Sequence, residues 1–172
     1  MPRSLETSPT QTARPRGAQD KKPAADRRIR DMVPEDKENF LSMVRMFYQS
    51  PAVESAVDEQ HFETTFHAAL SHSPYIRILM LEDRGQLVGY AQLSFTYSNE
   101  AGGMAVLIEE LYISRACRGR GMGHAFFSFL EKEYPDVKRF RLEVHSDNVR
   151  AIRLYRSLGY STLRYKQMIR DR

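Results

Sequence analysis

The stretch Arg118-Gly119-Arg120-Gly121-Met122-Gly123 has the residue types and the spacing of an anion-binding turn. An apolar run at residues 106–113 precedes it, and the run at 124–130 that follows carries aromatic residues at helical spacing. Glycines where a strand turns into a helix let backbone N–H groups approach an anion closely, and the helix N-terminus adds partial positive charge. The stretch therefore predicts a cradle for a phosphate or pyrophosphate. Taken alone, it is also compatible with a glycine-rich turn that binds nothing.

Two familiar nucleotide-binding motifs do not fit this stretch. No Gly-Lys-Ser or Gly-Lys-Thr follows the glycines, so it is not a P-loop. Gly119, Gly121 and Gly123 are each two residues apart, which is not the spacing of a dinucleotide-binding fingerprint. A second segment, Asn148 to Tyr160, follows about 25 residues further on and has the start and stop signals of another helix.

Together the two segments resemble a known family. Arg118-x-x-Gly121-x-Gly123 resembles the acetyl-CoA pyrophosphate motif of the GNAT superfamily of acyl-CoA-dependent N-acetyltransferases. Asn148-x-x-Ala151-x-x-Leu154-Tyr155-x-x-x-Gly159-Tyr160 resembles its second signature, in the same order and at the same distance. Gln86 to Ala91 resembles the strand before the cofactor-binding half, and the match covers about residues 28 to 172. The run Ile108 to Ile113 most resembles the polyamine-acetylating branch and its small-molecule relatives.

The resemblance implies acetyl-CoA as co-substrate and assigns the residues that would hold it. The pantetheine arm would lie beside the strand at Leu111, Tyr112 and Ile113 and bond to its main chain. Backbone amides across the glycine turn would hold the pyrophosphate, and the two arginine side chains would add charge or lie solvated in the loop. The implied cofactor-binding residues are Leu111, Tyr112, Ile113, Arg118, Gly119, Arg120, Gly121, Met122, Gly123, His124 and Asn148.

Acyl transfer from a thioester to an amine needs a neutral amine, a stabilised oxyanion and a proton for the departing thiolate. By resemblance, Tyr155 is the general acid whose hydroxyl faces the sulfur of CoA. A tyrosine with an ordinary pKa of ~10 is protonated at neutral pH and able to donate. Packing on the core is the structural alternative for Tyr155. For Asn148, an N-cap role and a contact with the cofactor arm are compatible.

Glu109 and Glu110 are the candidates for the group that receives the proton of the amine. Adjacent strand residues point to opposite faces, so we expect only one of them to face the acceptor. By resemblance Glu109 falls at the position of the polyamine acetyltransferases' active-site glutamate, whereas a β-bulge would change the phase and favour Glu110. His145, at the end of the next predicted strand, is the next candidate base. Cys117 has no partner base placed beside it, so an acyl-cysteine route is not expected.

Composition bounds the class of protein. At 172 residues the chain is expected to form one domain after a tail. A single cysteine, no apolar run of ~20 residues and no signal-peptide core lead us to expect a cytoplasmic protein without a membrane partner. Histidines lack the spacing of zinc ligands, so no metal is expected.

Charge is unevenly distributed along the chain. Residues 28–114 carry six basic and thirteen acidic side chains, whereas residues 115–172 carry fourteen basic and six acidic ones. This division suits a cationic acceptor on one side and an anionic cofactor on the other, although solvated surface charge is the alternative. The arginines lie on the cofactor motifs and are not interleaved with stacking aromatics, so no nucleic-acid partner is expected.

Periodicity predicts the elements that position these residues. Residues 1–27, with four prolines and no aromatic residue, are expected to form a disordered tail before a single domain at 28–172. Strands are predicted near Ile29 and at 75–82, 87–97, 104–113, 140–145 and 160–169, and helices after Pro34, around Phe62 to Leu70, at 124–134 and at 148–158. The predicted fold is α/β, a GNAT-like mixed and mostly antiparallel sheet flanked by helices in an α/β/α sandwich.

The sequence therefore predicts an N-acetyltransferase that moves an acetyl group from acetyl-CoA to a primary amine of a small molecule in a ternary complex. A protein lysine or N-terminal acetyltransferase and a non-catalytic acyl-CoA-binding sensor are the alternatives. The resemblance also leaves a homodimer open.

Overall fold

A computed structural model describes residues 26–51, 53 and 57–170 of the chain. The predicted tail lies outside these residues except at its end, because the first strand already begins at Arg27. Short 3-10 turns at Pro34–Asp36 and Arg115–Cys117 precede α1 and α3. The order is β1 (Arg27–Asp31), α1 (Lys37–Tyr48), α2 (Glu59–Leu70), β2 (Ile76–Asp83), β3 (Gln86–Ser98), β4 (Gly103–Ile113), α3 (Met122–Glu133), β5 (Arg139–Leu142) and α4 (Val149–Ser157).

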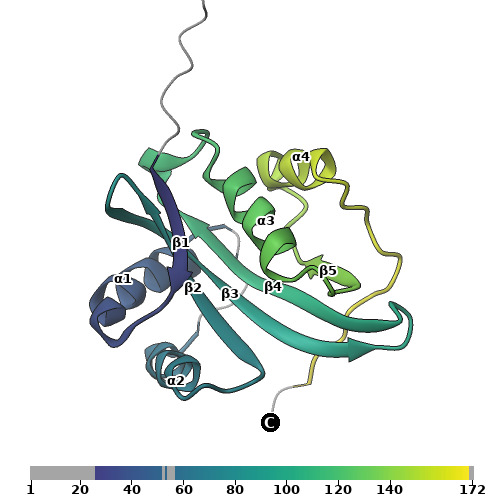
Figure 1. Cartoon of the computed structure of the whole chain (residues 1–172), viewed down its shortest axis with the longest axis horizontal. Coiled ribbons are helices and arrows are strands. Elements are labelled where there is room, and N and C mark those ends of the chain that lie inside the picture. The colour runs from purple at the N-terminus through teal and green to yellow at the C-terminus, as the bar shows by residue number, and fades with distance from the viewer. Residues whose placement is uncertain (1–25, 52, 54–56, 171–172) are drawn as a thin grey trace, which may run out of the picture.

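The five strands form one sheet in sequence order, β1-β2-β3-β4-β5 (Figure 1). The first four pair antiparallel, and β5 runs parallel to β4 after the crossover through α3. The tight turn between β2 and β3 has positive φ at Arg84 and Gly85, as the sequence Asp-Arg-Gly predicts. This is the mixed, mostly antiparallel sheet flanked by helices that the sequence predicts.

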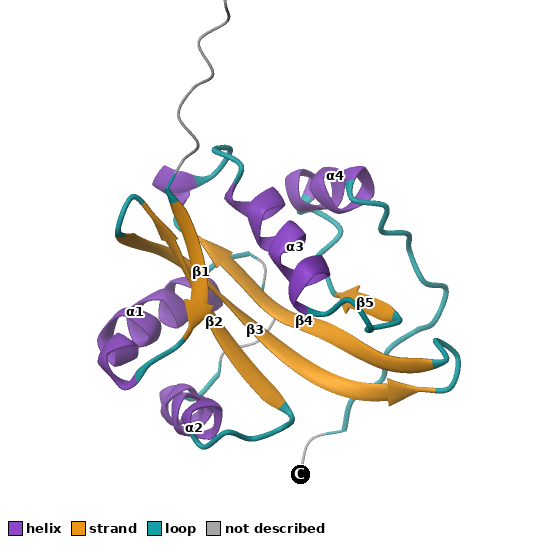
Figure 2. Ribbon diagram, in the orientation of Figure 1, coloured by secondary structure: helices purple, strands orange, loops and turns teal. Residues whose placement is uncertain are grey.

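Helices cover both faces of the sheet (Figure 2), and on each face a hydrophobic core lies between helices and sheet. On one face, α1 and α2 pack through Phe40 and Phe62 against Tyr90 of β3. On the other face, α3 packs through Phe126 and Leu130, and α4 joins this core through partly buried side chains. Each helix has its apolar residues three and four positions apart, so one stripe of the helix faces the sheet.

Arg30 ties β1 to α1 and to β2. Its guanidinium donates to both carboxylate oxygens of Asp36 at 2.6 and 2.9 Å and to Oε1 of Glu82 at 2.6 Å. The hydrogen bond from Arg30 holds the pKa of the buried Asp36 carboxyl below its ordinary value. Asp36 immediately precedes α1, so this contact fixes the start of the helix that carries Tyr48 at its other end.

Two sequence predictions need correction. Residues 160–169 form no strand, although their apolar and polar residues alternate. Leu163 and Tyr165 remain exposed there, so the segment lacks the burial that makes alternation a strand signal. The predicted strand at 140–145 is shorter, because β5 ends at Leu142 and the residues up to Asn148 form a loop. No helix in the described part of the chain is long and apolar enough to cross a membrane.

Gly89 in β3 lies so close to β4 that a side chain has no room. A Cβ at this position would lie 2.2 Å from the carbonyl oxygen of Tyr112 and 3.2 Å from Cα of Ile113. Both are backbone atoms that cannot shift without moving β4. We expect Gly89→Ala to lower the free energy of unfolding by about 3 kcal/mol, as measured by urea denaturation.

Gly102→Ala is the control for this change. In contrast to Gly89, Gly102 has nothing within 4 Å of an added Cβ, so only its φ of +76° disfavours alanine. That strain amounts to about 1 kcal/mol. Equal losses of stability in the two variants would contradict the close approach of β3 and β4.

Candidate active site

The predicted anion cradle is a loop that leads from β4 into α3. Gly119 and Gly121 adopt positive φ of 79° and 89°, and Gly121 is the N-cap of α3. Within the described residues, no acceptor pairs with the backbone N–H groups from Gly119 to His124. These N–H groups, at the positive end of the helix dipole, can bind an anion. Met122 contributes only its backbone here, since its side chain is in the core.

Four arginines come together around this loop. Arg118 bonds back through Nε to the carbonyl oxygen of Ile113 at 2.7 Å, and Arg120 is exposed. Arg27 of β1 donates to the carbonyl oxygen of Arg120 and lies 3.3 Å from where a Cβ of Gly121 would be. Arg150 of α4 lies 2.8 Å from where a Cβ of Gly119 would be. The loop is therefore strongly electropositive.

Sequence reasoning missed Arg27 and Arg150 as members of this cluster. Arg27 is assigned to the tail by composition, and Arg150 is a variable position of the second motif. Their contacts with the loop are made across the fold, so no local pattern could have indicated them. Gly123 also has a role beyond flexibility, because a Cβ there would lie 2.8 Å from Cδ2 of Leu154. It lets α4 pack closely on α3.

The second half of β4 is open on the side of β5. Parallel pairing covers only Ala105–Ile108 of β4 and Arg139–Leu142 of β5. Beyond Ile108, at the predicted pantetheine-binding residues Leu111, Tyr112 and Ile113, β3 is the only strand among the described residues that pairs with β4 (Figure 2). This edge can therefore accept an extended ligand chain through main-chain hydrogen bonds, and it leads directly to the glycine loop.

A β-bulge in β4 changes where the two glutamates point. The register of β3 and β4 shifts between Gln92 and Leu93, where Glu110 and Ile108 are the respective partners, so Glu109 is the extra residue. Ile108 faces the α3 core, but Glu109 bonds to Ser94 and Glu110 bonds to Tyr48 and Tyr90 on the α1/α2 face. The expectation that the adjacent carboxylates face opposite sides is wrong, because the bulge breaks the alternation. The bulge turns both carboxylates to the same face, so it does not by itself favour Glu110 over Glu109.

Glu110 is a buried carboxylate held by two tyrosine hydroxyls. It is 8% exposed, and it accepts from Tyr48 at 2.7 Å and from Tyr90 at 2.5 Å. Burial raises the pKa of Glu110, partly offset by the two hydrogen bonds to its charged form. The same burial, together with the neighbouring carboxylate, raises the pKa of both tyrosines. Glu109 is exposed and accepts from Ser94 at 2.7 Å.

Tyr155 lies on the opposite side of the sheet from these carboxylates. Its ring is part of the α3 core and contacts Phe127 edge to face, with ring centres 5.7 Å apart. Burial raises the pKa of its hydroxyl above the ordinary value, so the hydroxyl is protonated at neutral pH. Tyr155 is therefore a competent proton donor that does not touch Glu109 directly, because β4 separates the two.

The remaining predicted residues are placed as follows. Asn148 is the N-cap of α4, and its Oδ1 accepts from the N–H of Ala151 at 3.2 Å. His124 is exposed in the first turn of α3. His145 accepts from the N–H of Asp147 at 3.3 Å, which is a loop contact. Among the described residues, no group of three His, Cys, Asp or Glu side chains is arranged to hold a metal ion.

Known structures share this fold. A "possible acetyltransferase" from Clostridium difficile 630 is 15% identical with a TM-score of 0.70, over 84% of this chain and 97% of that one. A ribosomal-protein-alanine N-acetyltransferase from Brucella melitensis biovar Abortus 2308 is 17% identical with a TM-score of 0.69, over 84% and 99%. The aminoglycoside N-acetyltransferase AAC(6')-Iy in complex with CoA is 13% identical with a TM-score of 0.70, over 88% and 98%.

At these identities the structural agreement concerns the fold. Among curated proteins, none matches the chain. The sequence does match the model of the acetyltransferase (GNAT) family over residues 39–160, which is well over half of the chain and includes the glycine loop and the second motif. The chain therefore belongs to the GNAT family of acetyltransferases, which are acyl-CoA-dependent N-acetyltransferases.

Proposed function

We propose that this protein transfers an acetyl group from acetyl-CoA to a primary amine of a small molecule, by direct attack in a ternary complex. The observation that carries the proposal is the glycine loop. Its backbone N–H groups from Gly119 to His124 lack acceptors within the described residues, and Arg27, Arg118, Arg120 and Arg150 surround it. A site with this charge suits the pyrophosphate of CoA.

The open edge of β4 offers a binding surface for the pantetheine arm of acetyl-CoA. The pyrophosphate at the loop would allow the pantetheine arm to run along Leu111 to Ile113, where β5 no longer pairs. The thioester would then lie where β4 and β5 part, between the α3 side and the α1/α2 side of the sheet. Asn148, at the start of α4, would contact the arm in addition to capping its helix. The neighbour AAC(6')-Iy is itself a CoA complex, which supports CoA as a ligand of this fold.

The two faces of the sheet would then divide the chemistry. On the α1/α2 face, Glu109 and Glu110 attract the ammonium form of the acceptor, and Glu109 receives its proton directly or through water. The neutral amine nitrogen attacks the thioester carbonyl carbon, the nitrogen of the tetrahedral intermediate releases its second proton to water, and the C–S bond breaks. On the α3 face, the Tyr155 hydroxyl gives its proton to the departing sulfur and is reprotonated from solvent. The products are the acetylated amine and free CoA.

Gly121→Asp tests the cradle. Aspartate tolerates positive φ better than most residues, but its carboxylate would lie among the arginines of the loop and would compete with the pyrophosphate for Arg27. We expect calorimetry to show acetyl-CoA affinity at least ~10-fold weaker than in Gly121→Asn, which has the same shape without the charge. The difference between the two should shrink with added salt. Equal affinities in the two variants would refute the assignment of the loop.

Tyr155→Phe and Glu109→Gln test the division of labour. The phenylalanine keeps the ring contact with Phe127, so acetyl-CoA affinity should hold while kcat falls roughly ten- to a thousandfold. Glu109→Gln should depress kcat/KM for the amine most at low pH, where the amine is fully charged. Raising the pH should partly rescue Glu109→Gln and leave Tyr155→Phe unrescued. The same pH profile in both variants would show that these roles are wrong.

Glu110→Gln tests whether a buried charge is kept at the expense of stability. Because the pKa of Glu110 is raised by folding, the unfolded chain ionises first as pH rises. Glu110 therefore lowers stability increasingly as pH rises through and above its unfolded pKa of ~4.5. We expect Glu110→Gln to gain more stability over the wild type at pH 8 than at pH 5 in urea denaturation. Glu109→Gln, at an exposed site, is the control, and an equal pH dependence in the two variants would contradict the prediction.

A further inference from the structure

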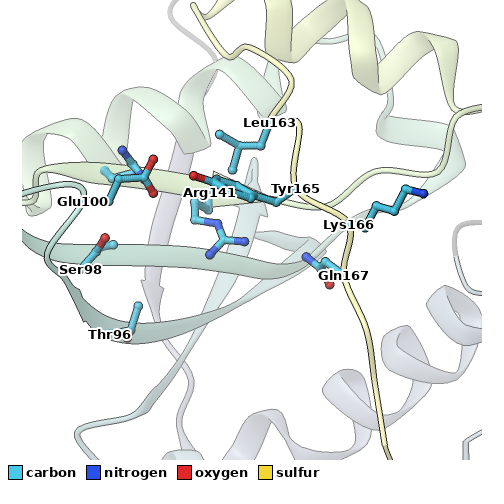
Figure 3. A pocket seen from close by; sticks show the side chains of 10 residues that line it. Thr96, Ser98, Glu100, Arg141, Leu163, Tyr165, Lys166 and Gln167 are labelled. Atoms are coloured by element: carbon cyan, nitrogen blue, oxygen red, sulfur yellow. The ribbon is translucent and has the colours of Figure 1, made fainter.

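A pocket of about 270 Å³ lies under the C-terminal segment (Figure 3). The strand residues that line it share the α1/α2 face with the glutamates. Its floor is made by β3, β4 and β5, and the C-terminal segment crosses over it. In Figure 3, Tyr165 is directed from that segment into the pocket, and Lys166 is directed away from it. The lining residues that matter here are Thr96, Ser98, Glu100, Arg139, Arg141 and Tyr165.

The floor of the pocket carries a positive charge that no carboxylate of the described residues neutralises. Arg139 is neutralised by Glu100, whose Oε2 lies 2.9 Å from its Nη1. No carboxylate in the described part of the chain forms an ion pair with Arg141, the next residue of β5 on the same face. Glu143, further along, accepts from the amide of Gln167. Hydroxyl groups of Thr96, Ser98 and Tyr165 complete the lining. Hydroxyl donors with one free guanidinium are the groups that bind a carboxylate or a phosphate.

The register of the sheet connects this pocket to the glutamates. Arg141 pairs with Leu107 of β4, and Leu107 shares the α1/α2 face with Glu109, two residues further along the strand. Two residues of strand span ~7 Å, and neighbouring strands are ~4.8 Å apart. The free guanidinium and the exposed carboxylate of Glu109 are thus neighbours on one surface, within the length of one small molecule.

We propose that the pocket binds an oxyanion at the far end of the acceptor, so that the substrate is an amine that also carries a carboxylate or a phosphate. The inference rests on the proposed function, which places the reacting amine at Glu109 and Glu110. An acceptor with a negative group at the other end satisfies both Arg141 and the glutamates. A diamine would place its second ammonium against Arg141, which is unfavourable.

A matched set of acceptors tests the pocket with the full chain and acetyl-CoA. 6-Aminohexanoate, hexylamine and 1,6-diaminohexane have the same length and end in a carboxylate, a methyl group or an ammonium. The phosphate ester of 4-aminobutanol tells a phosphate preference from a carboxylate preference. We expect KM for at least one of the two anionic acceptors to be at least ~10-fold lower than for hexylamine, the size of a charge-assisted hydrogen bond. The diamine should be the poorest acceptor.

Arg141→Gln should remove this preference by raising KM for the anionic acceptor at least ~10-fold, while kcat/KM for hexylamine and KM for acetyl-CoA stay unchanged. Arg141→Lys, which keeps the charge, should retain part of the preference for the anionic acceptor. Lys132→Gln removes an exposed charge from α3 and should leave every KM as in the wild type. A thermal melt of each variant verifies that it is folded.

The outcomes separate this inference from the proposed function. Release of free thiol with hexylamine but no preference for either anionic acceptor would overturn the inference and leave the acetyltransferase proposal standing. A rise of KM for acetyl-CoA in Arg141→Gln would overturn it too, because the pocket would then serve the co-substrate. Failure of the wild-type chain to bind acetyl-CoA in calorimetry would overturn the proposed function itself.

Discussion

The bulge at Glu109 in β4 is the constraint on which both halves of the candidate site depend. In a regular strand, one of two adjacent glutamates would point into the α3 core, where an unpaired carboxylate is strongly disfavoured. The extra residue turns both toward the α1/α2 face and returns Leu111 and Ile113 to the α3 core. A bulge also bends its strand, and the pairing of β4 with β5 ends at Ile108, just before it. One inserted residue thus accounts for the carboxylates and for the open edge.

The charge pattern of the sequence maps onto the site only in part. Glu109 and Glu110 come from the acidic segment 28–114, and Arg118, Arg120 and Arg150 come from the basic segment 115–172, as a cationic acceptor and an anionic co-substrate require. Arg27 is an exception, because it precedes both segments in the sequence and β1 places it at the glycine loop. Arg141 is a second exception, because it belongs to the basic segment but β5 places it on the face of the glutamates. The net charge of a sequence segment therefore predicts the charge of the site only in part, because folding places strands from the two segments side by side.

The sequence predicts the elements well wherever a local pattern defines them. Apolar spacing gives α1, α2 and α3, the Asp-Arg-Gly turn gives the β2–β3 hairpin, and Asn148 marks the start of α4. The glycine motif gives the loop and its positive φ angles. The bonds of Glu110 with Tyr48 and Tyr90 were beyond reach, because they join residues 62 and 20 positions apart, and the bulge could be raised only as an alternative. Such contacts depend on register, which no local pattern encodes.

The wrong prediction of a strand at residues 160–169 leads to the same surface as the glutamates. Alternation alone gave that prediction, and a paired strand there would have extended the sheet beyond β5 with side chains on both faces. Instead the segment crosses the α1/α2 face, where Leu163, Tyr165, Lys166 and Gln167 line a pocket with residues of β3, β4 and β5 (Figure 3). The C-terminal segment, which does not pair with the sheet, thereby covers the polar floor of this pocket. If the proposed function holds, an acceptor on this face would meet Glu110 beside Tyr48 of α1 and, further along the sheet, the pocket under the C-terminal segment. We therefore expect acceptor selectivity to depend on the least regular part of the described chain.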